Sequence, residues 1–348
     1  MKLGGIPQNP IERIAKALGL LPQPLLDTHI AMLLARAVME GARLGIFEAL
    51  RDGALTAPEV AARCGGQPRA TGKLLNALTG CEYLRFRDGR YSLAPIARKW
   101  LLGDSAQPLG DKMLLQFLEW DFIEHLGDYV RTGKPLDFHA TMTPEQWGAY
   151  QRGMRSAASS WAAEVARRTP VPKGARDMLD IGGSHGLLSA AICRRHPGLR
   201  SVILDLPEAI EHAAPLLAGE GMGDRVVHRA GDALKDDLGT AAWDVVFVSS
   251  LVHHFDDATN RALAKRIAKA LRPGGVYVIQ EFFRPASPNE AGQIGALLDL
   301  YFAVTSEAGT YSFQEMAGWQ REAGLKPRKP IKFLTAPGNG QQVAVKAT

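Results

Sequence analysis

The sequence lacks most of the features that mark secreted, membrane-bound or disulfide-rich proteins. Its 348 residues include three cysteines, Cys64, Cys81 and Cys193, which are too few and too scattered for a disulfide framework or a zinc site. No uncharged run approaches the roughly 18 residues that a transmembrane helix needs. The N-terminus also lacks the basic start and apolar core of a secretory signal. We therefore expect a cytoplasmic protein, in a reducing compartment and without a membrane partner.

Charge of one sign is not concentrated anywhere in the chain. The 41 Lys and Arg residues exceed the 36 Asp and Glu residues, which gives a formal net charge of +5, but the two signs are interleaved. Proteins that bind nucleic acid through an extended arm carry blocks of Lys and Arg, so we expect no nucleic-acid partner. With 46% hydrophobic and 22% charged residues, the composition is typical of a soluble enzyme of one or two domains.

The most informative stretch is MLDIGGSHGLLSAAI, at 178–192, which reads as a short strand, a Gly-rich turn and the start of a helix. Gly182, Gly183 and Gly186 permit backbone angles and a close approach that a Cβ would prevent. A helix that begins after such a turn directs its free N–H groups at whatever lies over the strand end. Asp180 adds a negative charge at that end. The stretch therefore favours a ligand that combines a nucleoside with a positive charge.

The spacing of these glycines differs from that of a dinucleotide site. The dinucleotide fingerprint is G-x-G-x-x-G, whereas this chain has G-G-x-x-G, which disfavours an NAD-dependent dehydrogenase. A second short strand ends at Asp205, where an acid is well placed to accept hydrogen bonds from ribose hydroxyls. Another acid, Asp232, follows Gly231. The alternative is that Asp180 and Asp205 only cap the helices that follow them.

The second half of the chain alternates short apolar strands with helices, which predicts a parallel sheet covered on both faces. In such a sheet a ligand lies at the carboxyl ends of the strands, so polar residues that follow strands converge on one rim. The tail reads as a hairpin, which adds one antiparallel strand. The expected strands are 178–181, 202–205, 225–229, 243–248, 276–280, 329–334 and 342–346, with helices from 187, from 207 and over 258–271, and a turn at 272–275.

The first hundred residues predict a winged helix. Residues 25–50 read as a long buried helix followed by a short turn at 47–50. Thr56 and Glu59 form a capping box at the start of the next helix. A further helix is expected over 68–83, and Asp88-Gly89 between two short strands is a strong hairpin signal. DNA binding is one interpretation of such a module. The second helix offers few basic contacts, which favours an interaction module instead.

Residues 105–170 read as helical and rich in aromatic side chains. Most of these side chains are expected in the core or an interface, and a few are candidates to line a pocket for a flat substrate. The segment 170–174, PVPKG, is the clearest linker and leads directly into the Gly-rich strand. The aromatic residues are Phe117, Trp120, Phe122, Tyr129, Trp147, Tyr150 and Trp161.

These patterns resemble the S-adenosylmethionine-dependent small-molecule O-methyltransferases from about residue 25 to the end. LDIGGSHG at 179–186 is similar to the first cofactor motif of that family, and LDLP at 204–207 to its ribose-binding motif. GDA at 231–233 resembles the segment that contacts adenine. SSLVHHFDD at 249–257 resembles the segment that carries the general base.

The resemblance implies an α/β fold, a Rossmann-like class I methyltransferase. Its mostly parallel seven-stranded sheet would have an antiparallel last strand and follow an all-α, winged-helix N-terminal domain. It divides the chain into a dimerisation domain at 1–105, a helical connection that lines the substrate pocket at 106–170, and a cofactor-binding domain at 171–348. A homodimer built through the first domain is therefore expected.

The resemblance also implies roles for individual residues. Asp180 would contact the amino group of S-adenosylmethionine, Asp205 the ribose and Asp232 the adenine. His253 would be the general base and Glu281 the acid that orients it; a base is useful because a phenol has a pKa near 10. The full set of cofactor-binding residues is Asp180, Gly182, Gly183, Gly186, Asp205, Leu206, Asp232, Ala233 and Ser249.

Two positions depart from the family pattern. A second acid that often braces the base is replaced by Thr310, and the Asp that usually follows the base is replaced by His254. Adjacent histidines raise a metal interpretation, with Asp256 or Glu281 as further ligands. The spacing matches no recognised metal site, so we expect no metal. A packed, non-catalytic His253 is the other alternative.

The resemblance finally implies a reaction and a class of substrate. The expected activity is methyl transfer to a hydroxyl of an aromatic or polyketide-like small molecule of secondary metabolism. Methyl transfer to carbon or nitrogen is the nearest alternative, because one fold serves several acceptors. A cofactor-binding regulator that uses the winged helix on DNA is a more distant one.

Overall fold

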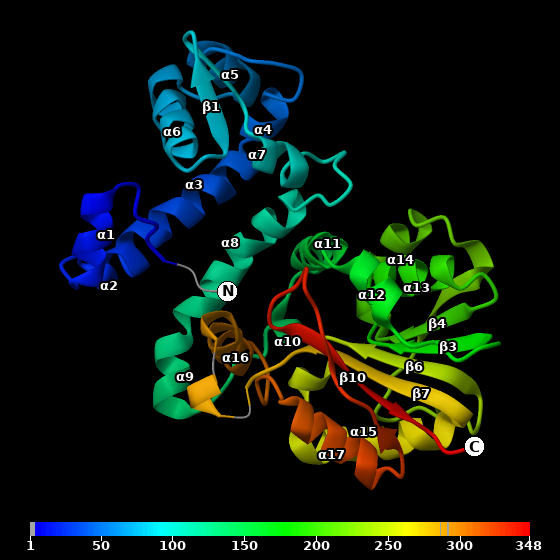
Figure 1. Cartoon of the computed structure of the whole chain (residues 1–348). Helices are drawn as coiled ribbons and strands as arrows, with labels where there is room; N and C mark the ends of the chain where they lie inside the picture. The colour runs from blue at the N-terminus through cyan, green and yellow to red at the C-terminus, as the bar shows by residue number, and fades with distance from the viewer. Residues whose placement is uncertain (1–3, 286, 291) are drawn as a thin grey trace. The chain divides into compact units, whose positions relative to one another are not determined.

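The computed structural model describes residues 4–285, 287–290 and 292–348. Internal packing divides the chain into two compact units, one up to Phe117 and one from Leu118 onward (Figure 1). The boundary falls inside a helix, and it groups residues 118–170 of the expected helical connection with the sheet but leaves 106–117 in the N-terminal unit. The finer boundaries at 105 and 170 therefore stay predictions.

The N-terminal unit contains the expected helices and hairpin. Thr56 and Glu59 form the capping box through reciprocal side-chain to backbone hydrogen bonds. Asp88 and Gly89 both have positive φ, 50° and 74°, as a tight hairpin turn requires. The elements are α1 (Pro10–Ala17), α2 (Gln23–Leu25), a π-helix (Leu26–Ile30), α3 (Ala31–Arg43), α4 (Ile46–Ala49), α5 (Ala57–Cys64), α6 (Pro68–Gly80), β1 (Leu84–Arg87), β2 (Arg90–Leu93) and α7 (Pro95–Trp100).

The expectation of a buried helix over residues 25–50 is wrong for much of that segment. Val38 and Met39 are buried, but Leu25 is 53% exposed and Leu33 is 51% exposed. An apolar surface of this kind is unusual on a monomer. It marks a face that the single chain leaves uncovered. The exposed large apolar residues of the unit up to α3 are Ile6, Ile11, Ile14, Leu18, Leu20, Leu25, Ile30, Met32, Leu33 and Leu34.

The C-terminal unit begins with helices and continues as the predicted alternation of strands and helices. The helix α8 (Gly110–Glu124) crosses the boundary between the units. The remaining elements are α9 (Leu126–Thr132), α10 (Phe138–Thr141), α11 (Pro144–Ser159), α12 (Ala162–Arg168), β3 (Asp177–Ile181), α13 (Leu187–Arg195), β4 (Arg200–Asp205), α14 (Pro207–Ala218), β5 (Val226–Ala230), β6 (Trp243–Ser249), α15 (Asp257–Ala270), β7 (Leu271–Phe282), α16 (Gln293–Thr305), α17 (Phe313–Glu322), β8 (Lys326–Pro327), β9 (Ile331–Lys332) and β10 (Asn339–Val345), with 3-10 turns at 223–225, 252–254 and 288–290.

The sheet has the order β5-β4-β3-β6-β7-β10-β8, and β9 also pairs with β10. The first five strands are parallel and β10 is antiparallel to β7. The described sheet has eight strands, one more than expected, because two short strands pair with different ends of β10. The expected turn at 272–275 is instead part of β7, which runs through it with a shift in register against β6.

Helices cover both faces of this sheet, as the apolar strands require. On one face Val246 and Val248 pack in a core with side chains of α15 and α17. On the other face Val245 and Phe247 pack with side chains of α12, α13 and α14. Because successive side chains of a strand alternate between faces, one short apolar strand supplies both cores. The carboxyl ends of β3, β4, β6 and β7 then form one polar rim.

Candidate active site

A cavity of about 980 Å³ lies at this rim, entirely within the C-terminal unit. One side, which we call the loop side, comes from the Gly-rich loop after β3 and the ends of β4 and β6. The other, the helix side, comes from α10, α11, the residues after β6 and the end of α16. Six of the predicted cofactor-binding residues line it: Asp180, Gly182, Gly183, Asp205, Leu206 and Ser249.

Asp180 is the most constrained group on the loop side. Its carboxylate is 1% exposed, and Oδ2 accepts a hydrogen bond from Ser189 Oγ at 2.7 Å, while Oδ1 has no partner in the described part of the chain. Burial raises its pKa from 3.8 to about 7, against the hydrogen bond from Ser189. A Cβ on Gly183 would lie 2.4 Å from Oδ2, so only glycine fits there. The unsatisfied oxygen suits a positively charged ligand group.

Asp205 holds the loop from the neighbouring strand. Its two carboxylate oxygens accept the backbone N–H groups of Ser184 and Leu206, each at 2.8 Å. Ser184 has a positive φ of 50°, and its hydroxyl donates to Gln151 on α11. The ring of His228 lies 2.8 Å from the Ser184 carbonyl. Three elements therefore fix one loop residue in a strained conformation.

The other predicted cofactor residues do not line the cavity. Gly186 has φ of 74°, and a Cβ there would lie 2.6 Å from Leu217, so its role is to let the loop turn against α14. Asp232 accepts a hydrogen bond from Leu234 N and pairs with Lys235 Nζ at 2.9 Å. The adenine contact of Asp232 and Ala233 stays a prediction.

His253 and Glu281 form a buried pair at the ends of β6 and β7. His253 is 3% exposed and Glu281 is fully buried. His253 Nδ1 lies 2.9 Å from Glu281 Oε2, and Glu281 Oε1 accepts the N–H of Phe282. The ring of Phe302 covers the His253 ring, with centroids 4.2 Å apart. The arrangement fixes one ring nitrogen and leaves Nε2 for chemistry, although His253 itself is not among the residues that line the cavity.

His254, in contrast, lines the cavity, as does His139 of α10. Their rings meet edge-on with centroids 4.9 Å apart. Burial lowers the pKa of His139 to about 4, with a smaller contribution from His253. The pKa of His254 is held well below its ordinary value, first by burial and then by the two neighbouring imidazoles. Both rings are therefore neutral near pH 7.

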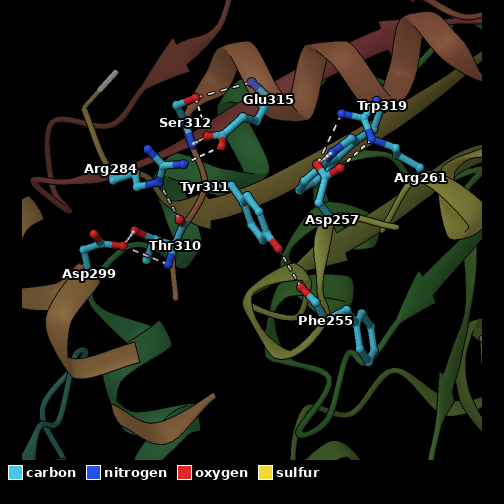
Figure 2. Close-up of polar contacts among 10 residues, drawn as sticks. All are labelled: Phe255, Asp257, Arg261, Arg284, Asp299, Thr310, Tyr311, Ser312, Glu315 and Trp319. Atoms are coloured by element: carbon cyan, nitrogen blue, oxygen red, sulfur yellow. Dashed lines mark hydrogen bonds and ion pairs between the residues drawn. The ribbon is translucent and has the colours of Figure 1, made fainter. Parts of the chain in front are cut away.

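Thr310, the residue in place of a second acid, contacts an acid of another element. Its backbone N–H and its hydroxyl both donate to Asp299 of α16 (Figure 2). Tyr311 Oη donates to the Phe255 carbonyl, just after the base, at 2.8 Å. Trp319 Nε1 donates to Asp257 at 2.7 Å. The last two contacts anchor the residues that follow His253 to α17 and to the segment just before it.

Several residues of the helix side were not singled out by the sequence. His139, Gln151 and Ser306 have no motif around them, and only the fold brings them to the cavity. The aromatic segment was a partial signal, because Trp147, Tyr150 and Trp161 do line the cavity. His185, in the Gly-rich loop, accepts the backbone N–H of Leu187 through Nδ1.

Among the described residues, no group of three or more His, Cys, Asp or Glu side chains is arranged to hold a metal ion. No helix among them is long and apolar enough to cross a membrane. Location in the cytoplasm stays a prediction.

Comparisons with known proteins extend over nearly the whole chain. A model of the O-methyltransferase domain matches residues 123–326, and one of the O-methyltransferase dimerisation domain matches 28–103. The chain is 28% identical to 3-hydroxy-5-methyl-1-naphthoate 3-O-methyltransferase from Streptomyces sahachiroi, over 94% of this chain and 96% of that protein. It is 29% identical to L-tyrosine C(3)-methyltransferase from Streptomyces lavendulae, over 85% of this chain and 84% of that protein.

A solved structure supports the fold independently. Human N-acetylserotonin methyltransferase in complex with S-adenosylmethionine superimposes with a TM-score of 0.83 at 19% identity, covering 99% of this chain and all of that one. The expected fold class, a Rossmann-like class I architecture after a helical N-terminal region, is confirmed.

Proposed function

The chain belongs to the O-methyltransferase family, and we propose that it transfers the methyl group of S-adenosylmethionine to a hydroxyl of an aromatic or polyketide-like small molecule, with His253 as general base. The observation that carries the proposal is the buried pair of His253 and Glu281, at 2.9 Å, on the rim that also holds the cavity. A titratable group and the acid that fixes its tautomer are the parts that proton removal from a hydroxyl needs.

The loop side fits the cofactor chemically. S-adenosylmethionine, when bound, supplies an electrophilic methyl group on a sulfonium. Asp180 would hold the positively charged amino group, since its Oδ1 is buried without a partner among the described residues. Asp205 would hold the ribose hydroxyls with the lone pairs that Ser184 and Leu206 leave open. Gly182 and Gly183 let the backbone approach closely.

His253 would take the hydroxyl proton on Nε2. Its Nδ1 would carry the other ring proton and donate it to Glu281, whose negative charge stabilises the imidazolium that forms. The main contribution of the remaining cavity is to hold the hydroxyl in line for attack. Trp147, Tyr150 and Trp161 give the helix side flat apolar surfaces, which suit an aromatic acceptor.

The test is methyl transfer to defined acceptors. Purified protein with methyl-labelled S-adenosylmethionine is incubated with a panel of phenolic and quinonoid compounds, and the product is examined by NMR. We expect the label on oxygen. A label on ring carbon or nitrogen would contradict the proposal and favour the alternative; the L-tyrosine relative is named as a C(3)-methyltransferase.

We also propose a homodimer built through residues 1–105. The support is the match of the dimerisation domain to residues 28–103 and the exposed apolar side chains up to α3. Covering such a surface with a second copy removes apolar area from water. Light scattering at micromolar concentration is expected to give twice 37.7 kDa, and a mass of one chain would contradict it.

A further inference from the structure

The adjacent histidines His253 and His254 differ in what they contact. His253 pairs with Glu281 and is almost fully buried. His254 lines the cavity, and its Nδ1 lies 3.2 Å from the hydroxyl oxygen of Ser306. Because Nδ1 is engaged, Nε2 is the ring nitrogen that a molecule in the cavity can contact.

The surroundings of His254 make it a hydrogen-bonding group and a poor base. The pKa of its imidazole lies well below the ordinary value because of burial and because His253 and His139 lie beside it. A neutral imidazole has one donor and one acceptor nitrogen. It can hold an oxygen through one uncharged hydrogen bond, but it does not retain the proton that an attacking hydroxyl releases.

Neighbouring rings restrict where His254 can point. His139 contacts it edge-on and itself stacks on Trp147, with centroids 5.5 Å apart. The hydroxyl of Ser306 lies next to Nδ1 of His254, on the side of the ring away from Nε2. The rings of His253 and His254 are 4.2 Å apart between centroids. The two imidazoles are therefore close enough for neighbouring substituents of one flat acceptor to reach both of them.

We propose that His254, oriented by Ser306, is a specificity-determining residue that hydrogen-bonds a second oxygen of the acceptor, on the carbon next to the one that bears the methylated hydroxyl. The substrate class is an aromatic ring with two neighbouring oxygens, an ortho-diol or an ortho-hydroxy carbonyl. The inference rests on the proposed function for the identity of the first oxygen. The contact with the second is a statement about binding, so equilibrium affinity tests it without turnover.

The probes are 1-naphthol, 1,2-dihydroxynaphthalene and 1-hydroxy-2-acetonaphthone. Each probe is titrated under anaerobic conditions into the full-length protein saturated with S-adenosylhomocysteine. The affinity is measured by calorimetry. We expect the two ortho-oxygenated probes to bind about tenfold more tightly than 1-naphthol, the effect of one uncharged hydrogen bond. His254→Phe should bring this ratio close to one, and His254→Gln, which keeps an amide near the position of Nε2, should retain part of it.

The matched control is His196→Phe, the same substitution at the end of α13 and outside the cavity, which should leave the ratio at its wild-type value. Ser306→Ala, which keeps the imidazole but loses its orientation, should lower the ratio about threefold. A wild-type ratio near one, or an equal loss of affinity for all three probes in His254→Phe, would overturn the inference. Methyl transfer to carbon would refute the proposed function, while the affinity ratio would still decide the role of His254.

Discussion

The two sides of the cavity are built from different kinds of structure. On the loop side, Asp180 and Gly183 come from one short stretch, and Asp205 comes from the end of the adjacent parallel strand. On the helix side, His139 and Ser306 come from α10 and from just beyond α16, which are far apart in the sequence. Backbone pairing in the sheet places the first group, whereas side-chain packing between helices places the second.

This difference matches the two ligands that we assign. A cofactor that is the same in every reaction is held by backbone N–H groups, glycines and two carboxylates whose positions the sheet fixes. An acceptor that differs between enzymes meets rings and hydroxyls that can be exchanged without altering the sheet. His253 follows β6 and Glu281 lies near the end of the neighbouring strand β7. The pair lies beside His254, which lines the cavity.

The largest effect is expected at His253. His253→Ala should lower kcat by about 10²–10⁴ at neutral pH, the usual range for a lost acid–base group, while cofactor affinity hardly changes. The loss should shrink as pH approaches the pKa of the acceptor, where the acceptor ionises unaided. Near wild-type turnover at pH 7 would mean that the acceptor arrives ionised or is not a hydroxyl. Activity restored by added metal would favour the metal interpretation instead.

The loop side can be tested without any acceptor, through the buried carboxyl of Asp180. Its pKa is raised in the folded protein to about 7, so its contribution to stability is fully present below its ordinary value of 3.8 and is lost as pH rises through about 7. Each pH unit in that window changes the free energy of unfolding by at most about 1.4 kcal/mol. Urea unfolding of the cofactor-free protein is expected to show wild type losing stability relative to Asp180→Asn between these limits. Equal pH dependence in both proteins would mean that the carboxyl ionises normally.

A smaller effect, on cofactor affinity, should distinguish Asp205 from Asp232, two acids at or just after the ends of neighbouring strands. Asp205→Ala should weaken binding of S-adenosylmethionine by about 1–3 kcal/mol, measured by calorimetry, because charge-assisted hydrogen bonds are lost. Asp232→Ala, at the residue whose carboxylate is engaged by Leu234 and Lys235, provides the comparison. An unchanged affinity in Asp205→Ala would remove that residue from the site. An equal loss in Asp232→Ala would support its predicted adenine contact.

The smallest loss is expected for Glu281→Gln. The amide oxygen can still accept the Nδ1 proton of His253, so the tautomer is kept while the negative charge that favours the imidazolium is lost. We expect kcat to fall about tenfold, less than in His253→Ala, with cofactor affinity retained. A loss as large as that of His253→Ala would mean that the charge, and not the orientation, of Glu281 is what the base requires.

Most of the residues that the sequence indicated for the loop side do line the cavity, because local rules determine their positions. Gly182 and Gly183 mark a turn by themselves, and an acid at a strand end such as Asp205 needs only the parallel topology to reach the rim. The same rules predicted the hairpin at Asp88 and the capping box at Thr56. Each of these signals spans a few residues whose geometry does not depend on the rest of the chain.

The helix side was not predictable in the same way. Nothing near Ser306 or Gln151 in the sequence indicates a site, because their positions depend on how α16 and α11 pack. The expectation of a buried helix at 25–50 was wrong because apolar periodicity does not distinguish a core from a face left for a partner. The extra strand arises because two short segments, β8 and β9, both pair with β10. The strand β7 continues through 272–275, where the register with β6 shifts and none of these four residues has a partner on β6.

The lack of space between Gly183 and Asp180 limits how this protein can be re-engineered. A Cβ at position 183 would lie 2.4 Å from the Asp180 carboxylate, so even alanine there forces the Asp180 side chain or the loop to move. Mutant libraries that aim at new acceptors should leave this loop intact and diversify His139, Trp147 and Ser306. Directed evolution would then explore substrate range at nearly constant cofactor affinity.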